Sequence, residues 1–308
     1  MFRSQLIFFI CLLLLAEGCR NGSPKDFPSE KKLADFPATQ FVPALEEKVT
    51  KGKNVIYAVS FLLAWDELRN QPGKPVISSV SQLKGVDQSD GYEKISAVEN
   101  DVKVGDEKIS IAASFEQSLS YAYPMESMKL TFKGNAVRAL GYEDGIAGGV
   151  KLLYYKNDDE FIISVQTLEK QEVLLAKGFD RGKSLRVMLN NISVAIKIGS
   201  KYSMETNDVL IIPVIRFNLS TNYPRMENSF ITANDKRYQI EKAAQRTAFL
   251  LTETGAKVER KVTNSGAVQK SKQLLFDKPF VVLLKNQTAA YPYFMMKVDN
   301  TELMMPLN

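Results

Sequence analysis

The chain has 308 residues, of which 45% are hydrophobic and 24% charged, and its formal net charge is +5. This length and composition are typical of a soluble protein with one sizeable core or two small ones. No dense Lys/Arg tract interleaved with aromatic residues is present, so we expect no nucleic-acid partner. Histidine is absent, which excludes His-dependent catalytic triads and the commonest zinc ligand.

The amino terminus predicts a secretion signal over residues 1–18. Arg3 is followed by an apolar run from Leu6 to Ala16 and by a small-x-small cleavage site that ends at Gly18. An apolar run of about eleven residues is too short to span a bilayer as a stable helix. We therefore expect this segment to be removed on export.

Cleavage at this site leaves Cys19 at the new amino terminus. The arrangement resembles a bacterial lipobox, although Glu17 is not its usual occupant. If Cys19 is lipidated, several acyl chains hold the protein stably on a membrane, since one chain binds only weakly. Cys11 is then discarded and no disulfide can form. The alternative is plain secretion with a free cysteine, so the predicted location is the bacterial cell envelope, lipid-anchored, or the medium.

Residues 19–37 contain Pro24, Pro28 and several charged residues, and we expect them to form a lipid-tethered linker before a domain over 38–308. Leu45–Thr50 could belong to a first helix. Ser60–Asn70 has a helical apolar stripe in which Trp65 is expected to be core, and Pro72-Gly73 ends it.

From Lys108 onward the pattern predicts mostly strands, as short apolar or alternating runs bounded by Gly, Asn, Asp or Lys. The predicted strands are Ile109–Phe115, Met128–Phe132, Ala136–Tyr142, Val150–Tyr155, Glu160–Leu168, Val173–Ala176, Ser184–Ile198, Asp208–Asn218, Arg246–Thr254 and Leu274–Leu284.

Catalytic chemistry has few candidates in this chain. Asp158-Asp159-Glu160 is an acidic cluster between two strand-like runs, and a solvated hairpin turn is favoured over a catalytic or calcium site. Gly145–Gly149 lacks the Gly-Lys-Ser/Thr ending of a phosphate-binding loop. With at most one cysteine left after export, thiolate nucleophiles and metal sites are also excluded. We expect no catalytic residue, no metal, no cofactor and no enzymatic activity.

The stretch from Gln245 to Leu284 is the most informative part of the chain. Thr247–Glu253 predicts a strand, and Leu274–Leu284 predicts a second, buried one. Between them Ala256–Gln273 forms a polar loop of 18 residues. Loops of this length without structure of their own are uncommon in compact domains and are often functional. We expect the two flanking strands to lie in one layer and the loop to be exposed to a partner.

These residues resemble the serpin family. Glu253-Thr-Gly255 is similar to the family's Glu-x-Gly hinge before its reactive-centre loop. Phe276–Phe280 resembles the F-(N/D)-(K/R)-P-F element after that loop, and Tyr293–Val298 resembles the closing strand. The spacing between the first two elements also fits the family.

Further matches lie upstream, at Asn54–Ala64 with Asn54 and Ser60 kept, at Val209–Phe217, and more loosely at Val150–Lys156. The resemblance implies an α+β fold with a large mixed β-sheet, small β-barrel sheets and Arg246–Thr254 as a central strand beside a gap. Only residues 71–107 follow the first helix where serpins carry several more helices, so the N-terminal helical layer is expected to be reduced.

The hinge departs from what inhibition requires. The resemblance implies that an inhibitory member inserts its cleaved loop into the main sheet, with small side chains entering the core. In the segment that follows Glu253 and Gly255, Ala256 and Val258 fit this requirement. Arg260, next on the same face, would be buried without an evident partner.

Three functional readings follow. The favoured one is a serpin-like lipoprotein that binds a partner, such as another envelope protein, and does not insert its loop. The alternative is an inhibitor of a serine or cysteine protease with its bait region around Val268, Gln269 and Lys270. The third is an unrelated β-rich surface lipoprotein whose motif matches are accidental.

Overall fold

The computed structural model describes residues 27–70, 76–77, 80–89, 92, 95, 98–123, 125–142, 149–169, 171–199, 204–205, 207–252, 271–286 and 289–307. The predicted signal and several predicted site residues lie outside the described residues. These are Cys19, Glu253, Gly255, Ala256, Val258, Arg260, Val268, Gln269 and Lys270.

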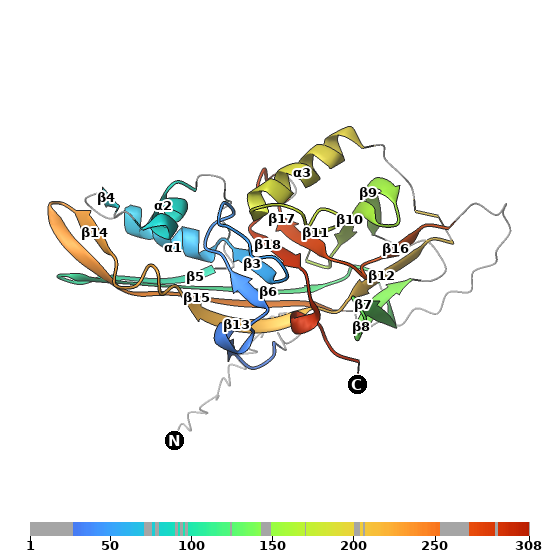
Figure 1. Ribbon diagram of the computed structural model, residues 1–308, viewed down its shortest axis with the longest axis horizontal. Coiled ribbons are helices and arrows are strands. Elements are labelled where there is room, and N and C mark those ends of the chain that lie inside the picture. Colours follow the sequence, from blue (N-terminus) through green and yellow to red (C-terminus); the bar gives the residue numbers. More distant parts are fainter. Residues whose placement is uncertain are drawn as a thin grey trace, which may run out of the picture.

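The fold is α+β, as expected, and is built on three sheets (Figure 1). In the first, the main sheet, the order is β1 (Lys31–Lys32), β13 (Arg216–Asn222), β15 (Lys236–Thr252), β14 (Phe230–Ala233) and β4 (Val76–Ile77). β6 (Lys108–Ser120) also pairs with β15, and β5 (Val98–Val104) pairs with β6. β15 runs parallel to β6 and antiparallel to β13, so the main sheet is mixed.

The second sheet has the order β2 (Thr39–Phe41), β3 (Asn54–Ala58), β18 (Phe294–Val298), β17 (Phe280–Lys285), β11 (Glu172–Lys177), β10 (Glu160–Gln166) and β9 (Val150–Asn157). The third has the order β16 (Gln273–Leu275), β12 (Val209–Pro213), β8 (Asn135–Tyr142) and β7 (Glu126–Phe132). Strands β3, β17 and β18 are buried on both faces, which explains their continuous apolar sequences.

Among the described residues the α-helices are α1 (Ser60–Arg69), α2 (Ser81–Asp87) and α3 (Leu185–Ile198), with 3-10 turns η1 (Leu33–Asp35) and η2 (Thr301–Leu303). Helix α1 packs on β5 and β6, and α3 lies over the second sheet (Figure 1). Trp65 of α1 is fully buried, as predicted. No helix in the described part of the chain is long and apolar enough to cross a membrane.

The prediction of a strand over Ser184–Ile198 is wrong, because this segment is helix α3. The Ser184 hydroxyl caps the helix by accepting a hydrogen bond from the Val187 backbone N–H. Its buried residues recur every three or four positions, which is the spacing of a helix face. They are Leu185, Met188, Leu189, Ile192 and Ala195. The helix predicted at Leu45–Thr50 is also absent, and Lys48 there forms an antiparallel bridge with Ser184.

Two predicted strands are each divided between sheets. The predicted Leu274–Leu284 strand is broken at residues 276–279, where Pro279 has no N–H to donate to a ladder, and its halves are β16 and β17. The predicted Asp208–Asn218 strand is divided after Pro213 into β12 and β13. Each break moves the chain from one sheet to another.

The boundary between linker and domain lies earlier than predicted. Residues 19–37 were expected to be a linker, but β1 pairs in parallel with Leu219 and Ser220 of β13. The Pro28 carbonyl oxygen also accepts a hydrogen bond from Asn218 Nδ2 at 2.9 Å. A segment too polar to fold alone is here ordered by the sheet edge that it covers. We call residues 28–32 the amino-terminal strap.

Candidate functional site

The candidate site is formed by the two ends that hold residues 253–270. Thr252 ends β15 on one side, and Ser271 precedes β16 on the other. The prediction that Arg246–Thr254 belongs to a central strand is confirmed for the described residues. The predicted gap beside it is wrong, since β6 pairs with β15 from Gln239↔Lys108 to Thr252↔Ser120. We call this parallel contact the seam.

The two ends lie in different sheets, which contradicts the expectation of one layer. β15 belongs to the main sheet, β16 to the third sheet, and β17 to the second. Eighteen residues can span about 60 Å when extended. The segment is therefore long enough to connect strands that belong to different sheets. The end of the predicted loop also moves, because Ser271–Gln273 are structured.

A buried amide holds the seam from its inner face. Gln245 of β15 donates through Nε2 to Ser60 Oγ at 3.2 Å and to Thr247 Oγ1 at 3.3 Å. Its Oε1 accepts from the hydroxyl of Tyr223 at 2.5 Å. All four side chains are buried, so this network ties β15 to the start of α1 and the turn after β13. Burial raises the pKa of Tyr223 well above its usual value, which keeps the hydroxyl as a donor.

Aromatic rings line the inner face next to this network. Phe249 of β15 stacks on Phe294 with ring centroids 4.8 Å apart, and Phe115 of β6 stacks on the same ring at 5.6 Å. Phe294 belongs to β18 of the second sheet. The seam therefore rests on a buried aromatic cluster between the two large sheets.

A guanidinium group ties the outer face of the seam. Arg246 lies 2.6 Å from Glu116 Oε1 of β6 and 3.2 Å from Glu30 Oε2 of the strap. Its Nε also donates to Asn218 Oδ1 of β13 at 2.9 Å. One side chain thus connects β6, β15, β13 and the amino-terminal strap.

The other end of the segment is held mainly by side chains. Lys272 N donates to Asp208 Oδ1 at 2.8 Å, and its ammonium lies 3.0 Å from Oδ2 of the same carboxylate. Gln273 N donates to Asp158 Oδ1 at 3.1 Å. Strand β16 itself contributes a parallel ladder of three residues with β12.

The ammonium of Lys177 is the centre of this anchor. Its side chain is 3% exposed, and Nζ lies 2.7 Å from Asp277 Oδ1 and 3.2 Å from Asp159 Oδ1. Nζ also donates to the Leu275 carbonyl oxygen at 2.7 Å and to the Asp158 carbonyl oxygen at 3.0 Å. The end of β11 is thereby fastened to β16 and to the turn after β9.

The acidic residues 158–159 form the predicted turn between β9 and β10, but they are not merely solvated. Hydrogen bonds from Lys278 and Lys177 lower the pKa of Asp159 below its usual value. Asp158 also accepts from the hydroxyl of Tyr155 at 2.8 Å. One sequence signal could have indicated this anchor: Lys177 lies at the end of an apolar strand, and a buried ammonium group needs a partner of opposite charge or a hydrogen-bond acceptor.

The described side chains around the two ends of the 253–270 segment hold strands and turns in place. No group of three or more His, Cys, Asp or Glu side chains that could hold a metal ion occurs among them. The side chains that surround both ends are paired with the chain's own carbonyl oxygens, carboxylates and hydroxyls.

Comparison with known proteins gives matches among solved structures. A serpin from the trematode Schistosoma haematobium matches with a TM-score of 0.43 and 15% identity, over 62% of this chain and 56% of that one. The Manduca sexta serine protease inhibitor (serpin)-12 matches with a TM-score of 0.40 and 10% identity, over 63% and 56%. The thermophilic serpin tengpin, in its native state, matches with a TM-score of 0.42 and 11% identity, over 63% and 55%.

All three of these structures are serpins, and their sequence identity to this chain is low. The match spans just over half the length of each of these structures. No protein-family model matches the chain. No curated protein matches it either.

Proposed function

We propose that this protein is a serpin-like lipoprotein of the cell envelope, or a secreted protein, that binds a partner and does not insert its loop to inhibit proteases. The proposal includes no catalytic activity. Its main support is the closed seam, whose inner face is buried and aromatic, together with the charges of the segment that would have to enter it.

Insertion would place a new strand between β6 and β15. Every pair along the seam would have to separate, and Arg246 would have to release Glu116. Side chains on the inner face of the new strand would then meet the rings of Phe115, Phe249 and Phe294. The backbone hydrogen bonds lost along the seam would be replaced by those of the new strand. Whether insertion is favourable therefore depends on the side chains that the new strand buries.

The sequence that follows Gly255 presents charge in either register. Alternate residues of a strand point to the same face. If Ala256 and Val258 face inward, Arg260 follows them; in the other register Lys257 and Glu259 do so. A charge buried without a partner costs several kcal/mol, so insertion should stop before or at residue 260.

Cleavage by trypsin tests this proposal. The expected result is a nicked 253–270 segment, no SDS-stable complex with the protease, and a melting temperature that changes little after nicking. An Arg260→Ala variant should gain more melting temperature on nicking than the parent, because its inner face carries one charge fewer. Lys270→Ala is the matched control and should behave as the parent. A stable complex and a large rise in melting temperature of the nicked parent would overturn the proposal.

One observation favours the second candidate, an inhibitor of a serine or cysteine endopeptidase. β6 and β15 are parallel neighbours, so a segment that folds back from the end of β15 would be antiparallel to both and could pair with both. The bait bond would then lie around Val268, Gln269 and Lys270, and the partner would be a protease. The same trypsin assay separates the two candidates.

A further inference from the structure

Two neighbouring loops carry an excess of cations. The first, residues 48–53 before β3, contains Lys48, Lys51 and Lys53, and the second, residues 180–183 before α3, contains Arg181 and Lys183. We call these five residues the basic surface. Lys48, Lys51, Arg181 and Lys183 are exposed and Lys53 is half-buried. The protein's net charge is +5, so these loops hold a large share of its excess.

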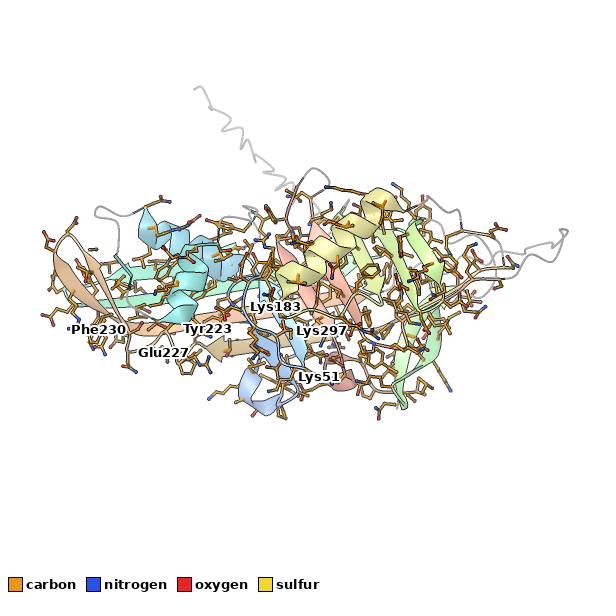
Figure 2. All side chains as sticks on the ribbon, turned by 45° about the horizontal axis from the view of Figure 1, so that its top comes forward. Lys51, Lys183, Tyr223, Glu227, Phe230 and Lys297 are labelled. Atoms are coloured by element: carbon orange, nitrogen blue, oxygen red, sulfur yellow. The ribbon has the colours of Figure 1, made fainter. Side chains whose placement is uncertain are left out.

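Backbone contacts hold the two loops side by side. Lys48 forms an antiparallel bridge with Ser184, and the Val49 N–H donates to the Lys183 carbonyl oxygen at 3.0 Å. Figure 2 labels Lys51 and Lys183 on this part of the molecule. The five cations thus share one region, although the two loops that carry them are more than a hundred residues apart in the sequence.

Among the described residues, no carboxylate serves as a counter-ion to the cations of the basic surface. In the described part of the chain, none of the five forms an ion pair within 4.0 Å. Asp180 is the one carboxylate within the two loops. The local charge is therefore strongly positive.

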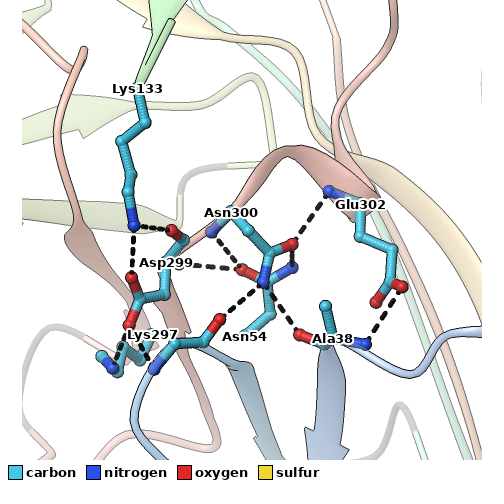
Figure 3. A network of polar contacts seen from close by, with 8 residues as sticks. Ala38, Asn54, Lys133, Lys297, Asp299, Asn300 and Glu302 are labelled. Atoms are coloured by element: carbon cyan, nitrogen blue, oxygen red, sulfur yellow. Dashed lines mark hydrogen bonds and ion pairs between the residues drawn. The ribbon is translucent and has the colours of Figure 1, made fainter. Parts of the chain in front are cut away.

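Two carboxylates beside the two loops, those of Glu46 and Asp299, are already engaged by other cations. Glu46 pairs with Arg186 at 2.6 Å. Asp299 pairs with Lys297 at 2.6 Å and with Lys133 at 3.0 Å (Figure 3). Asp299 Oδ2 also accepts from the Gly52 N–H at 3.1 Å, so it shapes the first loop while two other cations neutralise it.

The amino-terminal segment leads to the same region. The Asn54 N–H donates to the Ala38 carbonyl oxygen at 2.8 Å, and Thr39 of β2 pairs with Asn54 of β3. Asn300 Nδ2 donates to the Ala38 carbonyl oxygen and to that of Gly52 (Figure 3). Lys53 therefore lies close in space to Ala38, which follows the predicted tether and the amino-terminal strap in the chain.

We propose that the basic surface binds the anionic headgroups of phospholipids in the membrane to which the protein is tethered. Clusters of Lys and Arg beside an anchor are attracted by a negative lipid surface. The large apolar side chains exposed in the described residues lie elsewhere: Val104, Tyr123, Leu168, Val194, Ile198 and Phe230. The contact is therefore electrostatic and salt-sensitive. It orients the tethered domain so that the basic surface faces the membrane. The inference rests on the lipid anchor of the proposed function and not on whether the 253–270 segment inserts.

Vesicle binding tests this inference. The chain from residue 19, with Cys19→Ser so that no acyl chain contributes, is mixed with phosphatidylcholine vesicles with and without about 30% phosphatidylglycerol. We expect binding only to the anionic vesicles at low salt, and its loss at about 0.5 M salt. Lys51→Gln, Arg181→Gln and Lys183→Gln together should weaken binding about a hundredfold, since each cation contributes about fivefold.

A matched variant separates a specific surface from overall charge. Lys129→Gln, Lys197→Gln and Lys242→Gln remove the same charge from exposed lysines on β7, α3 and β15. This variant should bind nearly as well as the parent, and both variants should melt at the parent's temperature. Equal weakening by the two variants would overturn the proposal. So would binding to a sulfated polysaccharide or to DNA without binding to the anionic vesicles.

Discussion

Replacing Lys177 with methionine should destabilise the protein more than the loss of any exposed ion pair. Methionine keeps most of the aliphatic side chain, which lies at the end of β11 with its ammonium 5.8 Å from the centre of the Phe161 ring. The ammonium is lost, and with it the bonds to Asp277 Oδ1 and the Leu275 carbonyl oxygen, both at 2.7 Å. Lys177→Met thus isolates the polar function of this side chain.

The magnitude follows from the exposure of the groups left behind. Removing one partner of a fully buried ion pair costs about 3–5 kcal/mol, and a hydrogen bond to a charged group contributes about 1.5–3 kcal/mol. Asp277 is 32% exposed and Asp159 is 59% exposed and keeps Lys278, so water and Lys278 compensate in part. We expect a loss of about 2–4 kcal/mol, which corresponds to roughly 5–12 °C in melting temperature.

Urea unfolding with a fixed m-value measures this loss. Lys278→Met is the control, because it breaks an ion pair with the same Asp159. In that pair the Lys278 side chain is 56% exposed and the Asp159 side chain is 59% exposed. An exposed pair of this kind contributes less than about 1 kcal/mol. If the two variants lose equal stability, the buried ammonium is not the centre of the β16 anchor and the reasoning is refuted.

Three further predictions concern the seam and pH. Gln245→Ala should lower the unfolding free energy by about 2–4 kcal/mol, because it leaves the Tyr223 hydroxyl buried without its partner, and adding Tyr223→Phe should recover part of that loss in a double-mutant cycle. Arg246→Met should cost about 1–2 kcal/mol and should speed hydrogen exchange in β1, whereas unchanged exchange would mean that the strap is held without Arg246. Burial acts to raise the pKa of Asp299, but hydrogen bonds from Lys297 and Lys133 outweigh it and the pKa is lowered; the stability that it contributes is therefore present above its ordinary pKa of about 3.8 and is lost as pH falls through the lower folded value. The melting temperature should consequently fall on acidification, and Asp299→Asn should make that fall shallower.

The positions of most strands along the chain could be predicted from the sequence, because these strands are short apolar runs bounded by turn residues. Hairpins such as β9–β10 carry their turn in the sequence, here at residues 158–159. Helix α3 was misread because its apolar residues also form a dense β-branched run. The three- and four-residue spacing of Leu185, Met188 and Ile192 was the better signal.

Assignment of strands to sheets was beyond the sequence. Phe276–Phe280 was matched as a motif, yet nothing in its pattern indicates that β16 and β17 belong to different sheets. Such pairing depends on contacts between residues far apart in the chain, as between Lys177 and Leu275. For the same reason the pairing partners of Gln245 and Arg246 could not be named in advance, although a polar residue in an apolar strand predicts that a partner exists.

The two ends of the 253–270 segment are held by different kinds of interaction, and this difference bears on function. The β15 end shares a backbone ladder with β6 along the whole seam, and the hydrogen bonds of that ladder do not depend on side-chain charge, although the Arg246–Glu116 ion pair adds to them on the outer face. The β16 end has three residues of parallel ladder and relies on Lys177, Asp208 and Asp158. Loss of charge therefore weakens the β16 end while leaving the seam paired. A partner that pulls on the segment should therefore release β16 first and leave the main sheet closed.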